Sequence, residues 1–285
     1  MGRGCALSLT AEEERRRSVG ATPVDRDPGR IAAMFGRIAL RYDLMNRLMT
    51  LGLDRRWRGL GAAEARLAPG ERALDVCCGT GDLAFALADR WPGAEVTGLD
   101  FAPQMLALAR QKAARRLGAG AQVHGRSVQG GAVSDGRLAG RTPDFVQGDV
   151  LALPFEDGAF ASVTVGWGIR NVPDLSRALA EMVRVTRPGG RVVCLDSTRP
   201  PDGFGRRFHR IWSDRLVPLL GRVVAGEGGA YEYLPASVRD FPDADRLAAL
   251  MVAAGLTRVR YRRLGLGAVA LHVAEKPGRA PGEAA

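Results

Sequence analysis

Apolar runs and helix-spaced segments alternate along most of the chain. Short runs that are continuously apolar, or that alternate with period two, recur seven times, and segments with apolar residues three or four positions apart lie between most of them. The first pattern is typical of strands and the second of helices. Strands are predicted at 73–75, 95–99, 144–147, 160–165, 191–195, 257–264 and 267–274. Helical spacing is seen over 31–60 and 103–117, and a turn is predicted at 187–190. This order predicts an α/β protein, with a mostly parallel sheet, helices on both faces and an antiparallel terminal strand.

The same pattern divides the chain into parts. Its 285 residues are enough for one large domain with a full core. Polar ends without periodicity, and a stretch rich in Gly, Ala, Ser and Arg, predict flexible or surface segments. The expected parts are an N-terminal tail (1–28), a domain (29–277) that contains a helical cap (29–68), a surface insertion (118–143) and a further helical segment (203–235), and a C-terminal tail (278–285).

The stretch 73–100 predicts a strand, a turn, a helix and a second strand. Its first strand ends at Asp75, its second at Asp100, and Gly79 and Gly81 lie in the turn between them. Glycine permits positive φ and a close approach of the backbone to a ligand. Ligands bind beyond the carboxyl ends of parallel strands, so this turn is predicted to hold a nucleotide-type cofactor.

The charge of the turn indicates which cofactor it binds. Residues 79–84 also satisfy the loose dinucleotide fingerprint G-x-G-x-x-[GA]. However, a pyrophosphate would be repelled by Asp75 and Asp82, whereas S-adenosylmethionine carries an ammonium, a sulfonium and no phosphate. Asp100 is then expected to accept hydrogen bonds from the ribose hydroxyls. Two alternatives stay open: an NAD-dependent dehydrogenase, and ordinary solvated acids beside a structural glycine turn.

Further polar residues follow the next strands. Asp149 and Val150 come after the third predicted strand, where an adenine edge could meet a carboxylate and a backbone amide. Arg170 and Asn171 come after the fourth. Tyr42 lies with Asp43 and Asn46 inside an apolar helical face, where polar groups need partners, and a ligand beneath the helix could supply them.

The composition raises two classes of partner. A formal net charge of +10 and a pI near 10.4 are compatible with nucleic acid or an anionic membrane surface. Nearly all of the excess is arginine, since Lys112 and Lys276 are the only lysines. An arginine-rich and alanine-rich composition also arises from a GC-rich coding sequence. Because no basic tract is interleaved with aromatic residues, no nucleic-acid partner is predicted.

Membrane and metal signals are weak in this sequence. No run reaches the 18 apolar residues of a transmembrane helix, so the expected location is the cytoplasm, with the protein either soluble or in peripheral contact at the inner face of the cell membrane. The four cysteines have no C-x-x-C spacing and the three histidines no H-E-x-x-H pattern, so no metal site is predicted.

Several long segments, in one order, resemble the menaquinone and ubiquinone biosynthesis C-methyltransferase family, which belongs to the Rossmann-like class I S-adenosylmethionine-dependent methyltransferases. The similarity covers about residues 30–277. The segments that carry it are RYDLMNRLMTLGLDRRWR, LDVCCGTGD, GLD, GDVLALPFEDGAFASVTVGWGIRNVPD, RVTRPGGRVVCLDSTRP and YEYLPASVRDFPDADRLAALMVAAGL. The chain departs from the family pattern at Thr50, Asp54, Cys78 and Asp196.

The resemblance implies a function and a set of site residues. The implied reaction is methylation of a ring carbon of a polyprenylated quinol, with demethylmenaquinol favoured over the ubiquinone precursor or the substrate of another small-molecule methyltransferase. Cofactor contacts are implied at Thr80, Asp100, Asp149 and Val150, with Asp75, Gly79 and Gly81 in the same turn. Arg170 and Asn171 occupy the place proposed to activate the quinol, and Tyr42 is a further catalytic candidate.

The role of Arg170 has two interpretations. Arginine stays cationic at working pH, so this residue would stabilise a quinolate or orient a water rather than act as the base. Alternatively, its fork pairs with a nearby acid and fixes the loop. Two wider expectations are a homodimer and an interfacial helix within 204–220, where apolar residues lie beside arginines.

Overall fold

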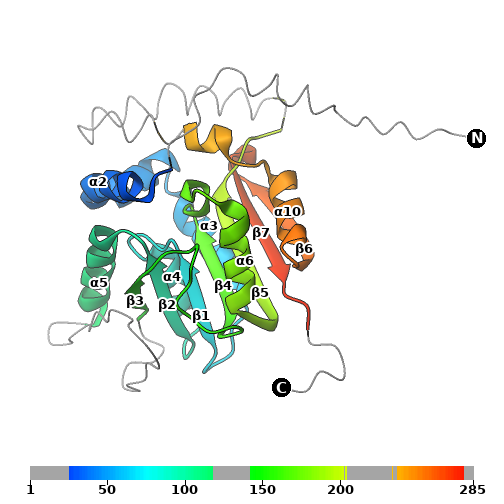
Figure 1. Ribbon diagram of the computed structural model, residues 1–285. Helices are drawn as coiled ribbons and strands as arrows, with labels where there is room; N and C mark the ends of the chain where they lie inside the picture. Colours follow the sequence, from blue (N-terminus) through cyan, green and yellow to red (C-terminus); the bar gives the residue numbers. More distant parts are fainter. Residues whose placement is uncertain (1–25, 118–141, 202, 204–232, 234–235, 279–285) are drawn as a thin grey trace, which may run out of the picture.

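The structure, a computed structural model, describes residues 26–117, 142–201, 203, 233 and 236–278 (Figure 1). Seven strands form one sheet in the order β3-β2-β1-β4-β5-β7-β6. Their bounds are Arg72–Val76 (β1), Glu95–Asp100 (β2), Asp144–Gln147 (β3), Phe160–Gly166 (β4), Thr186–Ser197 (β5), Thr257–Leu264 (β6) and Val269–Glu275 (β7). Among the described strands, β7 alone runs antiparallel to the other six, and it lies between β5 and β6. The predicted α/β architecture is confirmed.

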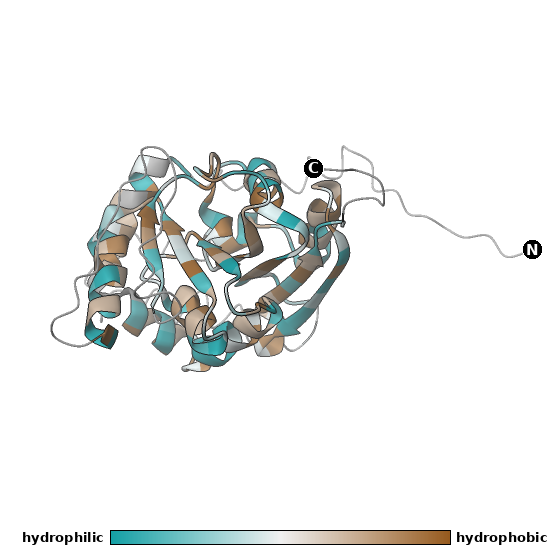
Figure 2. Ribbon diagram, turned by 90° about the horizontal axis from the view of Figure 1, so that it is seen from below, coloured by the Kyte–Doolittle hydropathy of each residue, from teal (hydrophilic) through white to brown (hydrophobic). Residues whose placement is uncertain are grey.

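Helices cover both faces of the sheet. Leucine, alanine and phenylalanine side chains of α3, α4 and α5 form one buried cluster with the sheet, and those of α6 and α10 form another on the opposite face. Figure 2 shows hydrophobic and hydrophilic stretches on the same helices, as expected where each helix buries one side. The bounds are Leu53–Glu64 (α3), Asp82–Arg90 (α4), Pro103–Leu117 (α5), Leu175–Val185 (α6) and Ala244–Ala253 (α10).

The N-terminal helical cap consists of α2 (Pro28–Met49) and α3. The helical spacing seen over 31–60 is interrupted because Gly52 takes a φ of 77°, which ends one helix and starts the next. Asp27 caps α2 by accepting a hydrogen bond from the N–H of Arg30. Phe35, Ile38 and Met45 are buried and pack α2 onto α5, so α2 lies beside the carboxyl edge of the sheet, whereas α3 packs on one of its faces (Figure 1).

The turn predicted at 187–190 lies inside β5 instead. Phe160 pairs with Thr186 and Ser162 with Arg191, so residues 187–190 bulge out of the ladder between β4 and β5. Gly189 supplies a φ of 74° there, and its N–H donates to the carbonyl of Lys276. The Pro-Gly-Gly sequence therefore forms a bulge within one strand rather than a turn before it.

Several expected parts fall wholly or largely outside the described residues. These are the two tails, the insertion at 118–143 and the helical segment at 203–235 that includes the expected interfacial helix. Within the described ranges, no helix is long and apolar enough to cross a membrane.

Candidate cofactor and substrate site

One pocket opens where β1, β2 and β4 end. Most residues predicted for the cofactor line it: Asp75, Gly79, Thr80, Asp100, Asp149 and Val150. Asn171 lines it from η1 (Ile169–Asn171), and Ile31 and Phe35 reach it from α2. Residues that follow β1, β2, β3 and β4 thus meet at the carboxyl edge of the sheet, as the topology requires, and α2 adds a fifth segment.

The two glycines of the turn have different roles. Gly79 and Gly81 take φ values of 55° and 84°, which L side chains rarely adopt. A Cβ on Gly79 would meet nothing within 4 Å, so its backbone faces open space in the pocket. A Cβ on Gly81 would lie 2.6 Å from Cζ of Phe145. Gly81 is therefore required by packing against that ring. The sequence had indicated Gly81 as a cofactor residue, but it does not line the pocket.

Asp100 fixes the shape of the turn. Its Oδ2 accepts from the N–H of Gly79 at 2.7 Å, and its Oδ1 accepts from the N–H of Ala102 at 2.8 Å. Burial raises the pKa of Asp100, although these N–H donors act in the opposite sense. Each carboxylate oxygen can accept a second hydrogen bond, so the group can hold the turn and still receive a ribose hydroxyl.

Asp75 is a buried acid at the floor of the pocket. Its side chain is fully buried, and Thr164 donates to Oδ1 at 2.8 Å. Oδ2 is also buried and has no hydrogen-bond partner among the described residues. Burial raises the pKa of Asp75 to about 7. Asp75 is thus neither a solvated acid nor a permanent charge, and a cationic group entering the pocket would satisfy its open oxygen.

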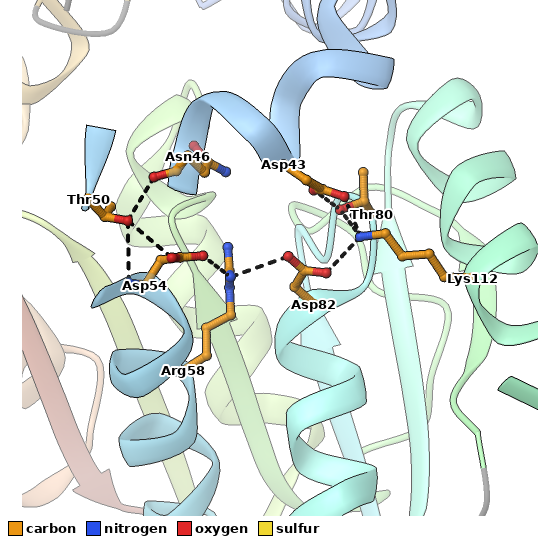
Figure 3. A network of polar contacts seen from close by, with 8 residues as sticks. All are labelled: Asp43, Asn46, Thr50, Asp54, Arg58, Thr80, Asp82 and Lys112. Carbon is orange, nitrogen blue, oxygen red and sulfur yellow. Dashed lines mark hydrogen bonds and ion pairs between the residues drawn. The ribbon is translucent and has the colours of Figure 1, made fainter. Parts of the chain in front are cut away.

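A network of ion pairs joins the helical cap to the turn (Figure 3). Lys112 Nζ on α5 lies 2.6 Å from both Asp43 of α2 and Asp82 of α4. It also donates to the hydroxyl of Thr80 at 2.9 Å, while that hydroxyl donates to Asp43 at 2.7 Å. The partners expected for Asp43 are therefore protein groups, and Thr80 is held in place by side chains from two helices.

Asp82 faces a second cation. Arg58 of α3 lies 3.3 Å from Asp82 and 2.5 Å from Asp54, and its guanidinium stacks 5.0 Å from the centre of the Trp167 ring. With Lys112 on its other side, the charge of Asp82 is matched within the protein (Figure 3). The sequence predicted that Asp82 is a free carboxylate that repels a pyrophosphate. In the structure its charge is instead paired with Arg58 and Lys112.

Arg170 forms a buried ion pair with Asp196. The two side chains are 5% and 1% exposed, Nη1 lies 2.8 Å from Oδ1, and Nη1 also donates to the carbonyl of Trp167 at 2.6 Å. Arg170 is not among the described residues that line the pocket, whereas its neighbour Asn171 is. Asn171 Oδ1 accepts from the hydroxyl of Tyr233 at 3.1 Å.

The remaining residues singled out in the sequence are Asp149, Tyr42 and the departures from the family pattern. Asp149 Oδ1 accepts from the N–H of Leu151 at 2.9 Å at the end of β3. Tyr42 lies in α2, but its side chain is outside the description. Two of the departures, Asp54 and Asp196, are each paired with an arginine.

Sequence reasoning missed three residues of the site, which are Lys112, Arg58 and Trp167. The only signal for Lys112 was its rarity, as one of two lysines in the chain. No pattern brought Arg58 or Trp167 to notice, because their relation to the turn depends on how α3 packs against α4 and β5. Among the described residues, no group of three or more His, Cys, Asp or Glu side chains could hold a metal ion.

Comparison with known proteins identifies the family. Residues 24–276 match the ubiE/COQ5 methyltransferase family. The chain belongs to this family. It is 45% identical to the demethylmenaquinone methyltransferase of Thermus thermophilus, over 86% of this chain and 100% of that protein. Identity is 43% to the protein of the same name from Deinococcus radiodurans, over 86% and 92%.

Other relatives agree at a coarser level. The ubiquinone/menaquinone biosynthesis C-methyltransferase UbiE of Paracoccus denitrificans is 38% identical over 93% of this chain and 98% of that protein. The solved structure of the [4+2]-cyclase SpnF shares the fold with a TM-score of 0.58 at 18% identity, over 91% and 98% of the two chains. The protein is a methyltransferase, and its cofactor is S-adenosylmethionine.

Proposed function

We propose that this methyltransferase converts demethylmenaquinol to menaquinol by methylating a ring carbon. The observation that carries the proposal is its 45% and 43% identity, over nearly the whole length, to two proteins named demethylmenaquinone methyltransferase. The relatives named UbiE support a second candidate, a ubiquinone-pathway quinol, at 38% identity.

The cofactor assignment follows from the pocket. Asp100 would accept the ribose hydroxyls, and Asp149 with the N–H of Val150 would meet the adenine edge. Asp75 would receive the ammonium group through its unsatisfied buried oxygen. Gly79 leaves open space beside these carboxylates, so the pocket fits a cofactor with two cationic centres and no phosphate.

S-adenosylmethionine supplies an electrophilic methyl group, and the protein must supply an oriented nucleophile. A quinol carbon attacks well only after a ring hydroxyl has lost its proton, and the carbon then loses its own proton after the methyl is transferred. Asn171 and Tyr42 are proposed to orient the quinol head group. Arg170 is proposed to favour the quinolate while Asp196 holds its guanidinium in place.

The same function implies a location for the enzyme. A polyprenyl tail partitions into the bilayer, so we expect the protein to work at the inner face of the cell membrane, in peripheral contact with it. Association as a homodimer stays a prediction, which sedimentation velocity would test.

The direct test supplies purified protein with methyl-labelled S-adenosylmethionine and a short-chain quinol. Demethylmenaquinol and the ubiquinone precursor are compared as substrates, and the product is identified by mass spectrometry. A ring C-methyl product from demethylmenaquinol supports the proposal. Transfer only to the ubiquinone precursor would favour the second candidate, and transfer to neither would contradict both.

A further inference from the structure

Exposed leucines gather at the turn that joins α2 to α3. Leu44 and Leu48 lie one turn apart on α2, Leu51 follows in the turn, and Leu53 opens α3; their exposed fractions are 50%, 38%, 70% and 41%. These four are among only seven exposed large hydrophobic residues in the described part of the chain, and they fall within ten consecutive positions. Scattered exposed leucines are ordinary, whereas a contiguous group marks an interaction surface.

Arginines without acidic partners surround these leucines. Arg47, Arg55 and Arg56 are exposed, and none of them forms an ion pair within the ranges that the structure describes. Other exposed arginines, such as Arg116 and Arg187, do have carboxylate partners.

The acids nearest in sequence to these arginines are already engaged. Asp54 is buried against Arg58, and Asp43 is held by Lys112 (Figure 3). The positive charge of this turn is therefore available to an anionic partner.

The turn joins two helices that help to form the walls of the pocket. The same helix α2 that presents Leu44 and Leu48 outward sends Ile31 and Phe35 to the pocket. On α3, Trp57 packs against Trp167, a pocket-lining residue, with ring centres 6.4 Å apart. The two helices that flank the turn therefore both contribute to the walls of the pocket, α2 through Ile31 and Phe35 and α3 through Arg58.

We propose that this leucine–arginine surface, made of Leu44, Leu48, Leu51 and Leu53 with Arg47, Arg55 and Arg56, docks the enzyme on an anionic lipid bilayer. The inference rests on the proposed function, because a polyprenylated substrate resides in the bilayer. Flexible aliphatic side chains flanked by arginines suit the acyl boundary and the lipid phosphates. A protein interface would more typically present exposed aromatic anchors, and among the side chains that the structure describes on this surface there is none.

Vesicle co-sedimentation of the full chain tests the proposal. Wild-type protein should sediment with phosphatidylglycerol vesicles at low ionic strength, bind phosphatidylcholine vesicles weakly, and be released from the anionic vesicles by salt. Each arginine contributes a factor of roughly five on an anionic surface. The double variant Arg55→Glu/Arg56→Glu should therefore bind at least about 25-fold more weakly. No binding of wild-type protein to anionic vesicles would overturn the proposal.

Matched variants separate this surface from the overall charge. Arg246→Glu/Arg262→Glu changes the net charge equally at exposed positions of α10 and β6, and should keep most of the binding. Leu48→Gln/Leu51→Asn should weaken binding at least tenfold, and asparagine tolerates the φ of 53° at position 51. The control Val252→Gln, at a 57% exposed position, should not weaken vesicle binding. Equal losses in control and surface variants would contradict the assignment.

An activity measurement separates this proposal from the proposed function. Surface variants should methylate a short-chain quinol in solution as wild-type protein does, but lose turnover with a long-chain quinol embedded in vesicles. If wild-type protein methylates neither quinol, the proposed function fails, whereas vesicle binding is still measured by sedimentation. If the variants lose turnover with the soluble quinol as well, the surface does not act through the membrane.

Discussion

Asp75 couples the cofactor pocket to pH. Its carboxyl is buried beneath the turn, its pKa is raised to about 7, and one oxygen lacks a partner among the described residues. An ammonium group binds the ionised form, so binding below pH 7 requires the loss of a proton from Asp75. Cofactor affinity is expected to be roughly tenfold lower at pH 6 than at pH 8, measured by calorimetry.

The variant Asp75→Asn is the control for this dependence. It should bind the cofactor weakly, and its cofactor affinity should not change between pH 6 and 8. The folded pKa lies above the unfolded value, so the free wild-type protein should lose stability as pH rises from about 4 to 7, by up to about 4 kcal/mol. Asp75→Asn should lack this loss. A pH-independent wild-type affinity would show that Asp75 does not meet the ammonium.

Because Arg170 is paired with Asp196 in the interior, replacing Arg170 alone is expected to affect stability as well as turnover. Arg170→Ala leaves the carboxylate of Asp196 uncompensated in the interior and should destabilise the fold by about 3–5 kcal/mol. The double variant Arg170→Met/Asp196→Asn should recover most of that stability in denaturant unfolding. If this folded variant keeps cofactor affinity but loses turnover, Arg170 favours the quinolate. Full turnover would make it a structural residue only.

The sequence located the site residues unevenly. Gly79 and Asp100 could be predicted because the sequence shows a strand, a glycine turn, a helix and a second strand. In parallel sheets a ligand binds at the carboxyl ends of the strands, where Asp100 lies. Lys112 lies one helix away, and only the packing of α4 and α5 on the same face of the sheet brings its ammonium to Asp82. Asp82 could not be distinguished from a free carboxylate in the sequence, because its partners are distant along the chain.

At the scale of elements, Lys112 joins α5, α4 and α2. Lys112→Met leaves Asp43 and Asp82 without their common cation and should weaken the seating of α2 over the cofactor turn. A loss of about 1–2 kcal/mol in unfolding free energy and of about tenfold in cofactor affinity is expected. Thermal unfolding and calorimetry measure the two.

The matched control is Arg116→Met on the same helix. Its partner Asp89 is exposed, and surface pairs contribute at most about 1 kcal/mol. Arg116→Met should therefore leave cofactor affinity unchanged. Equal effects of the two variants would show that the network does not position α2.

Elements with one strong pattern were predicted well, because β4 is apolar throughout and α5 keeps helical spacing to its end. The sequence at 187–190 was misread as a turn. Glycine and proline there satisfy a bulge as well as a turn, and only pairing with β4 and β7 decides between them. Similarly, the break between α2 and α3 depends on the single left-handed residue pair at Leu51 and Gly52.

At the scale of the whole molecule, the pocket and the two residues that flank the 118–143 insertion in the described chain, Leu117 and Asp144, lie at opposite edges of the sheet. The pocket is built at the carboxyl ends of the strands, whereas the chain leaves α5 at Leu117 and enters β3 at its amino end, Asp144. Asp144 pairs with Thr97 at the outer strand pair of the sheet. The described chain therefore leaves α5 and enters β3 on the side of the sheet away from the cofactor pocket.

Replacing residues 120–141 with a short Gly/Ser link should therefore leave the enzyme nearly intact. Closure entropy changes slowly with loop length, so unfolding free energy should shift by less than about 1 kcal/mol. Cofactor affinity by calorimetry and turnover with a short-chain quinol should both stay within about twofold, which corresponds to less than 1 kcal/mol. A shortened protein that folds and binds cofactor but loses turnover would instead assign the insertion to the substrate site.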